Sequence, residues 1–265
     1  MKRNIIRQLL NDGQPTIGTH LQNMWPGYVE VIGHSGMFDY IEFFATDGVY
    51  NLFTLDDIGR SLSLFDHMSG MIKLPQDLRT YLVERSIGAG FHSILFADIR
   101  TAEDAKEAVA AARPEIPNGI GIHGWADRRN VNFGVNVDPD EMVQTVNDTV
   151  VILIIEKKRG VENLDQILEV PGIDMICFGP ADYSVTVGLT GQSKHPAVKE
   201  AEMYTYESAI KKGILCRPDV VSVENAKPYM EMGIKDFCIG SDLRGFYDFC
   251  LKQGEAISRA LSKSK

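Results

Sequence analysis

Residues Val150 to Gly191 read VVILIIEKKRGVENLDQILEVPGIDMICFGPADYSVTVGLTG, and this stretch decides the fold. The run Val150–Ile155 is wholly apolar and stops at Glu156, which is typical of a strand buried on both faces of a parallel sheet. Apolar residues at helical spacing follow, at Val161, Leu164, Ile167 and Leu168. Met175–Phe178 is a second buried strand. Strand, helix and strand in this order predict a β/α unit with parallel strands.

Two carboxylates stand just beyond the two strands. Glu156 follows the first directly, and Asp182 follows the second after Gly179-Pro180-Ala181. In a β/α barrel the carboxyl ends of the strands form the catalytic face. Two oxygen ligands there, with positions left for water and substrate, suit a Mg²⁺-type or Mn²⁺-type ion. The alternative is that Glu156 is a strand-end charge and Asp182 a helix N-cap.

The rest of the chain repeats this unit, so we expect a single TIM barrel domain over residues 1–265, with eight strands, a short N-terminal helix and a C-terminal helix. The six other expected strands are Thr16–Leu21, Phe38–Phe44, Met71–Leu74, Ser93–Ala97, Gly213–Arg217 and Asp236–Gly240. The expected helices include residues 1–14 at the bottom of the barrel, Trp25–Gly33, Leu55–His67, one from Pro75, Thr101–Ala112, Pro139–Val146, Ala197–Lys212, Val223–Met232 and one from Phe246.

Two segments are predicted to be long loops. Pro114–Val137 contains two prolines and several glycines and has no clean period, so we expect an excursion over the catalytic face. The run SVTVGLTGQSKHP, residues 184–196, is also expected to be a loop.

Composition excludes several classes of partner. A net charge of −9 and a pI near 5.2 argue against nucleic acid, which needs a basic footprint. No apolar stretch approaches a membrane span, and the N-terminus lacks the pattern of a signal peptide. The cysteines have no metal-type spacing and are expected to be reduced, in a cytoplasmic protein. They are Cys177, Cys216, Cys238 and Cys250.

The segment from Ile154 to Val198 resembles the HpcH/HpaI aldolase family, the class II metal-dependent pyruvate aldolases, which include 2-dehydro-3-deoxyglucarate aldolase-like enzymes. The shared pattern is a strand ending in Glu156, the helical run NLDQIL, the turn PGID and the sequence GPADYS. The resemblance implies that Glu156 and Asp182 hold a divalent metal, and that Gly179, Pro180 and Ala181 cradle the substrate carboxylate. It also implies a homo-oligomer, a trimer or a hexamer.

The chain departs from the family pattern at the acid/base residues. Asp47 stands where the family's catalytic His is usual, and Phe44 where the Asp that orients it is usual. The family's Arg after strand three corresponds to Lys73, which keeps the charge but not the bidentate fork. Ile154 replaces a Gln that commonly precedes the metal-binding Glu. This chain therefore resembles a divergent subgroup that lacks the usual catalytic His.

Four residues are candidates for the altered chemistry. Lys73 is a candidate for stabilising an enolate or binding the substrate carboxylate. Asp47 is either a base or a turn residue before Gly48. Glu42, inside a strand, either points into the barrel as part of the site or pairs with a cation. His20 ends strand one and is either an acid/base group or a structural His.

The loop sequence GIHGWADRRN offers His123, Arg128 and Arg129. The adjacent arginines either reach a second carboxylate of the substrate or form salt bridges between subunits. Arg217, at the end of a strand, is a weaker candidate for the site.

The function that the resemblance implies is aldol cleavage of a 2-oxo acid through a metal-bound enolate, typically giving pyruvate and an aldehyde. The cofactor is expected to be Mg²⁺ or Mn²⁺, with Co²⁺ sharing the ligand set. The altered acid/base residues leave two alternatives open: a related enolate-forming lyase or decarboxylase, and a non-catalytic protein that binds metal or oxo acid.

Overall fold

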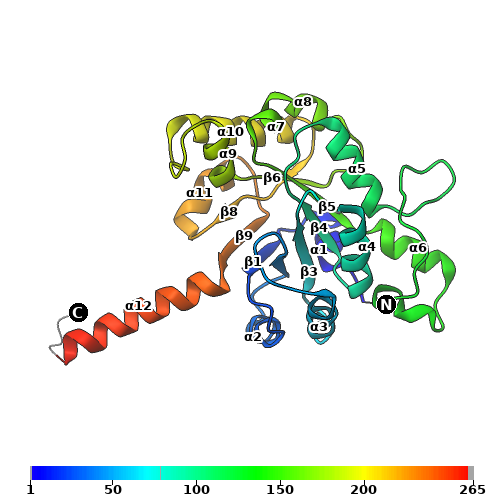
Figure 1. Cartoon of the computed structure of the whole chain (residues 1–265), viewed down its shortest axis with the longest axis horizontal. Helices are drawn as coiled ribbons and strands as arrows, with labels where there is room; N and C mark the ends of the chain where they lie inside the picture. The colour runs from blue at the N-terminus through cyan, green and yellow to red at the C-terminus, as the bar shows by residue number, and fades with distance from the viewer. Residues whose placement is uncertain (1, 78, 262–265) are drawn as a thin grey trace.

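The computed structural model describes residues 2–77 and 79–261. Its strands form one parallel sheet in the order β7-β6-β5-β4-β3-β2-β1-β9-β8 (Figure 1). The strands are β1 Ile17–Leu21, β2 Tyr40–Phe44, β3 Ser69–Leu74, β4 Ser93–Phe96, β5 Val150–Ile155, β6 Met175–Phe178, β7 Leu215–Cys216, β8 Asp219–Val220 and β9 Phe237–Ser241.

The two edge strands of this sheet, β7 and β8, belong to one short stretch of the chain, residues 215–220. Only Arg217 and Pro218 separate β7, which pairs with β6, from β8, which pairs with β9. Pro218 has no N–H for a ladder, so it interrupts a strand that otherwise closes the circle. The expected eight-stranded β/α barrel is confirmed, and its seventh strand extends past the predicted end at Arg217.

Helices surround the sheet (Figure 1). They are α1 Ile5–Asn11, α2 Gly27–Ser35, α3 Leu52–Leu62, α4 Arg79–Ala89, α5 Ala102–Ala112, α6 Pro139–Asn147, α7 Lys158–Glu162, α8 Leu164–Ile167, α9 Pro180–Thr186, α10 Pro196–Lys211, α11 Val223–Glu231 and α12 Asp242–Ala260, with a 3₁₀ turn at Arg129–Gly134. No described helix has the length and apolar character needed to cross a membrane.

Some helix boundaries differ from the predicted ones because side-chain caps decide them. Asn51 forms a capping box with Thr54, so α3 begins three residues before Leu55. Ser241 caps α12, which therefore begins before Phe246. Pro180 begins α9, so the expected loop after Ser184 is helical at its start.

The side chains of β5 point alternately into the barrel and toward the helices, and both of these surroundings are apolar. Val150, Ile152 and Ile154 belong to the cluster that fills the barrel interior. The intervening residues belong to the larger cluster between strands and helices. They are Val151, Leu153 and Ile155. Because neighbouring side chains of a strand point to opposite faces, a barrel strand needs apolar residues at every position below the catalytic mouth.

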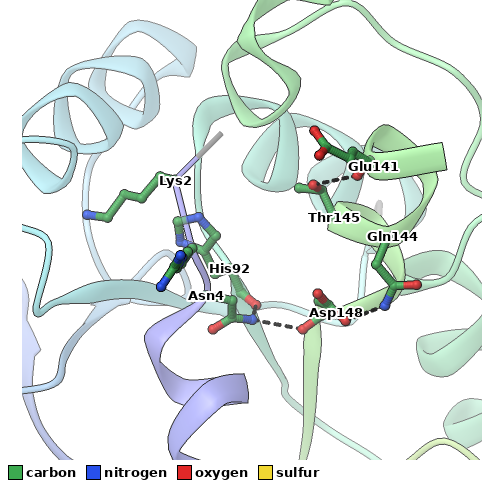
Figure 2. Close-up of a pocket in the computed structure, with 8 residues that line it drawn as sticks. Lys2, Asn4, His92, Glu141, Gln144, Thr145 and Asp148 are labelled. Carbon is green, nitrogen blue, oxygen red and sulfur yellow. Dashed lines mark hydrogen bonds between the residues drawn. The ribbon is translucent and has the colours of Figure 1, made fainter. Parts of the chain in front are cut away.

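The N-terminal segment closes the bottom of the barrel, as predicted. The Asn4 side-chain amide donates to the carbonyls of His92 and Asp148, which precede β4 and β5. Arg7 makes two 2.7 Å bonds to Asp174, just before β6. A cavity of about 300 Å³ lies beside this segment (Figure 2). Burial lowers the pKa of His92, in its lining, to about 3, so that imidazole is neutral.

The predicted excursion over the catalytic face lies elsewhere. Residues 113–138 connect α5 to α6 and β5, so they run at the amino ends of the strands, opposite to the mouth. Their contacts agree: a Cβ at Gly88 would meet the Arg128 side chain at 2.5 Å, and one at Gly90 would meet Arg129 at 3.2 Å. Both glycines lie just before the start of β4. The prediction was wrong because a loop's length does not say which end of the barrel it covers.

Helix α12 extends away from the barrel (Figure 1). None of its described residues is buried. Its exposed large apolar side chains are Leu243, Phe246, Tyr247, Phe249, Leu251 and Ile257. An amphipathic helix of 19 residues with no covered face is unusual for a chain that works alone.

Candidate active site

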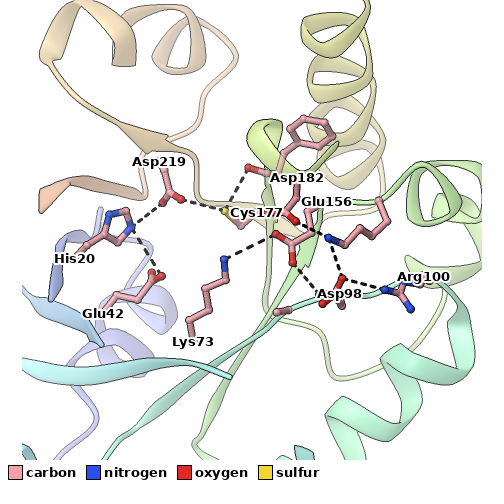
Figure 3. Close-up of polar contacts among 12 residues, drawn as sticks. His20, Glu42, Lys73, Asp98, Arg100, Glu156, Cys177, Asp182 and Asp219 are labelled. Atoms are coloured by element: carbon pink, nitrogen blue, oxygen red, sulfur yellow. Dashed lines mark hydrogen bonds and ion pairs between the residues drawn. The ribbon is translucent and has the colours of Figure 1, made fainter. Parts of the chain in front are cut away.

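Glu156 lies at the mouth of the barrel, directly after β5 (Figure 3). Its carboxylate is buried, and Oε1 accepts a 2.9 Å hydrogen bond from the Asp98 backbone N–H. Oε2 lies 3.8 Å from Lys73 Nζ. Burial raises the pKa of Glu156, and the Lys73 ammonium opposes this shift. Because the carboxylate is held rigidly and only partly compensated, it is suited to a further cation.

Asp182 comes from the first turn of α9 and is half-exposed. Its Oδ1 accepts a 2.6 Å hydrogen bond from Lys157 Nζ, which also lies 3.2 Å from Asp98 Oδ1. Burial opposes the charge on Lys157, but its hydrogen bonds with Asp182 and Asp98 raise its pKa. The ammonium therefore bridges the two aspartates beside Glu156.

Lys73 stands between the two halves of the site (Figure 3). It belongs to β3, and its Nζ lies 5.4 Å from the centre of the Phe44 ring as well as 3.8 Å from Glu156. A cation placed over an aromatic face and beside a carboxylate is held in one position. It can stabilise negative charge that develops on a substrate oxygen.

The residues at this mouth fit a divalent metal. Glu156 and Asp182 supply hard oxygen ligands from the ends of neighbouring strands, with room left for substrate. Burial raises the pKa of Glu156 although Lys73 lies beside it, and a bound cation would oppose that shift. Lys157 contacts Asp98 as well as Asp182, so it would keep one carboxylate partner if Asp182 held an ion.

A second polar group lies on the other side of Lys73 (Figure 3). His20 Nε2 is 3.4 Å from Asp219 Oδ1 and 3.8 Å from Glu42 Oε1. Arg217, fully buried, forms ion pairs with both carboxylates. Its Nε also donates to the Tyr40 hydroxyl at 3.0 Å. Glu42 therefore points into the barrel and also pairs with a cation, Arg217. The two alternatives considered from the sequence are compatible.

The structure brings together most of the residues singled out from the sequence, but not all. Glu42, Lys73 and His20 meet at the mouth. Asp47 is exposed in the turn after β2, where the Gly48 N–H bonds to the Phe44 carbonyl. His123 and Arg128 lie at the opposite end of the barrel, so within one chain they do not reach Glu156 and Asp182.

Three residues of the site were missed by sequence reasoning. Asp98 holds Glu156 through its N–H and adopts a left-handed backbone, with φ of 58°. Lys157 and Asp219 complete the two ion clusters. Their positions in the sequence were the available signal, because each lies within three residues of the end of a strand at the catalytic face. Asp98 follows β4, Lys157 follows β5 and Asp219 follows β7.

Comparison with known proteins agrees with this geometry. The sequence profile of the HpcH/HpaI aldolase/citrate lyase family matches residues 66–247. The chain belongs to the HpcH/HpaI aldolase/citrate lyase family. It is therefore a metal-dependent carbon–carbon lyase of the class II aldolase type.

Individual relatives of this HpcH/HpaI family chain extend the match beyond the profile. A 5-keto-4-deoxy-D-glucarate aldolase of Klebsiella pneumoniae is 29% identical over 239 residues, 88% of this chain and 89% of that protein. A solved HpcH/HpaI aldolase/citrate lyase family protein from Burkholderia cenocepacia has a TM-score of 0.87 at 23% identity, covering 96% of this chain and 99% of that one. The citrate synthase SbnG has a TM-score of 0.84 at 21% identity, covering 97% and 98%. At these identities the two structures show the shared fold.

Proposed function

We propose that this protein cleaves a hydroxylated 2-oxo acid into pyruvate, or a related 2-oxo acid, and an aldehyde, by way of an enolate. The observation that carries the proposal is the placement of Lys73 Nζ 3.8 Å from Glu156 Oε2 at the barrel mouth. Breaking a bond next to a carbonyl leaves negative charge on the carbonyl oxygen. A fixed ammonium beside the metal-binding carboxylate lies where that charge develops.

In this proposal, separate residues bind the metal ion and the substrate carboxylate. Glu156 and Asp182 would hold the divalent ion, which when bound supplies positive charge to the substrate's oxygens. Mg²⁺ or Mn²⁺ would suit two carboxylate ligands, and Co²⁺ shares this ligand set. We assign the substrate carboxylate to the backbone from Gly179 to Ala181, because it lies at the start of α9, where backbone N–H groups suit an anion. This backbone packs directly on Glu156: a Cβ on Gly179 would meet Glu156 Cβ at 2.5 Å.

The substrate class follows from the same site and from one relative. Lys73, Lys157 and a divalent ion together favour an anionic substrate with several oxygens. The sugar-acid substrate in the name of the Klebsiella relative agrees with this class.

The test is exchange of the methyl protons of pyruvate in D₂O, followed by NMR with and without Mg²⁺ or Mn²⁺. We expect metal-dependent exchange that Glu156→Gln abolishes and that Lys73→Ala slows by about 10²-fold or more. Lys158→Ala is the matched control, because Lys158 is an exposed lysine whose ion pair is with Glu162 on its own helix.

Three other outcomes would contradict the proposal. Exchange that Glu156→Gln leaves intact would remove the metal site from the reaction. Decarboxylation of oxaloacetate without any exchange of pyruvate would favour the related lyase that does not process pyruvate. Bound metal with no turnover of any 2-oxo acid would favour a non-catalytic binding protein.

We also propose that the chain is a cytoplasmic homo-oligomer, a trimer or a hexamer, to which α12 contributes. The uncovered apolar side chains of α12 support assembly, and the four free cysteines support a reducing compartment. Phe246→Asp with Phe249→Asp should lower the mass measured by light scattering. An unchanged mass would exclude α12 from the interface.

A further inference from the structure

The mouth of the barrel holds a second ion cluster that the metal site does not use. His20 and Glu42 come from the paired strands β1 and β2, in register with each other. Asp219 begins β8, and Arg217 precedes it in the break between β7 and β8. These four residues alternate in charge, with Asp219 and Glu42 each in contact with both His20 and Arg217.

This cluster is suited to holding a proton rather than a second metal. His20, Glu42, Asp219 and Cys238 offer ligand atoms within 4.8 Å of one another. However, Arg217 already contacts both carboxylates, and a buried guanidinium beside an added divalent ion would be repelled. An imidazolium at His20, together with Arg217, places two positive groups against the carboxylates of Glu42 and Asp219 without another cation.

The cluster lies close enough to the enolate site to act on the same substrate. The His20 ring packs on Phe44 with 4.6 Å between ring centres, and Lys73 Nζ lies 5.4 Å from the centre of the same Phe44 ring. Lys73 in turn contacts Glu156. Figure 3 shows Lys73 between the group of His20, Glu42 and Asp219 and the group of Glu156, Asp98 and Asp182. We therefore place the oxygens of a small 2-oxo acid toward Glu156 and Lys73 and its methyl carbon toward His20.

We propose that His20 is the group that gives a proton to the enolate carbon during cleavage and takes it back in the reverse direction. Asp219 is the positioning residue that holds the imidazolium. This inference rests on the proposed function. In the step, an N–H bond of the imidazolium breaks and a C–H bond forms at the enolate carbon. The substrate hydroxyl gives up its proton to water as the aldehyde forms, and the neutral imidazole regains a proton from that water, which reaches the partly exposed Asp219, so no net proton is consumed.

The charged groups around His20 set the pH at which it works. Burial favours neutral imidazole, but Cys238 and Asp219 outweigh it and raise the pKa of His20 to about 10. Glu42 and Asp219 both face Nε2 of His20, and the cations nearby are Arg217 and Lys73. Exchange of pyruvate protons starts from neutral imidazole, so its rate should rise with pH toward 10. A carboxylate base would give a flat profile over that range.

Two reactions of the full-length, metal-loaded enzyme test the proposal. Decarboxylation of oxaloacetate forms the enolate without removing a C–H proton, whereas exchange of pyruvate needs that removal. His20→Asn should lower exchange by ~10²- to 10⁴-fold while decarboxylation changes by less than about threefold. His34→Asn, on the exposed side of α2, is the matched control. Asp219→Asn should lower the pH midpoint of exchange, because Asp219 is one of the groups that raise the pKa of His20.

Each outcome separates this inference from the proposed function. If the wild-type protein performs neither reaction, the proposed function fails and His20 is not the cause. If His20→Asn exchanges pyruvate protons at the wild-type rate, or Asp219→Asn leaves the pH midpoint unchanged, the assignment of His20 is overturned. Two equivalents of Mn²⁺ per wild-type chain that fall to one in His20→Asn would also overturn it, in favour of a second metal site.

Discussion

Arg217 forms ion pairs with Glu42 and Asp219, the two carboxylates beside His20. Its removal should destabilise the protein strongly. Arg217 and Glu42 both have 0% exposed side chains, and Arg217 also bonds Asp219 at 2.9 Å and Tyr40 at 3.0 Å. Arg217→Met leaves Glu42 buried with only His20 as a cationic partner, 3.8 Å away. Breaking a buried pair in this way costs about 3–5 kcal/mol.

The assay is equilibrium unfolding in urea, followed by circular dichroism. The double variant Arg217→Met with Glu42→Met removes both charges and should recover at least about 2 kcal/mol relative to the sum of the two single variants. Arg60→Met is the control: its pair with Asp57 is exposed, and its loss should cost less than about 1 kcal/mol. A loss in Arg217→Met as small as the control's, or strictly additive single variants, would refute the reasoning.

Three further predictions concern other parts of the molecule. His20 keeps its proton to about pH 10 when folded but releases it near 6.5 when unfolded, so its contribution to stability, at most about 5 kcal/mol, is complete below pH 6.5 and lost as pH rises toward 10; the difference in unfolding free energy between wild type and His20→Asn should shrink over that range, and a constant difference would count against it. Gly179→Ala places a Cβ 2.5 Å from Glu156 Cβ and should reduce metal affinity measured by calorimetry, whereas Gly124→Ala, with no atom within 4 Å, should not. Asp174→Asn weakens the clamp with Arg7 and Arg113 at the bottom of the barrel and should cost about 2 kcal/mol in urea unfolding without changing kcat/KM; a loss of activity in folded protein would contradict it.

The barrel could be predicted because its signals are local. Each strand is a short apolar run that stops at a polar residue, as Val150–Ile155 stops at Glu156, and each unit repeats that order. The placement of Glu156 and Asp182 was predictable for the same reason: the ends of parallel strands must meet at one face, so two carboxylates placed there lie on the same side of the barrel.

The second cluster could not be predicted as a unit. His20 and Glu42 lie about twenty residues apart in the chain, and Arg217 and Asp219 join them only because the barrel closes between β8 and β9 and between β1 and β2. Sequence reasoning weighed His20, Glu42 and Arg217 one at a time. Each residue's role depends on the charges of the other three.

The sequence by itself determined the alternation of strands and helices, the face on which chemistry occurs and the two carboxylates suited to a metal, because strand periodicity and strand ends are properties of consecutive residues. Tertiary structure alone decided that Pro114–Val137 lies at the bottom, that Lys157 bridges Asp98 and Asp182, that Asp219 and Glu42 lie beside His20, and that Cys238 and Asp219 raise the pKa of His20 against the effect of burial. Those outcomes depend on burial and on Coulomb interactions between residues far apart in the chain, and these arise only when the barrel has closed.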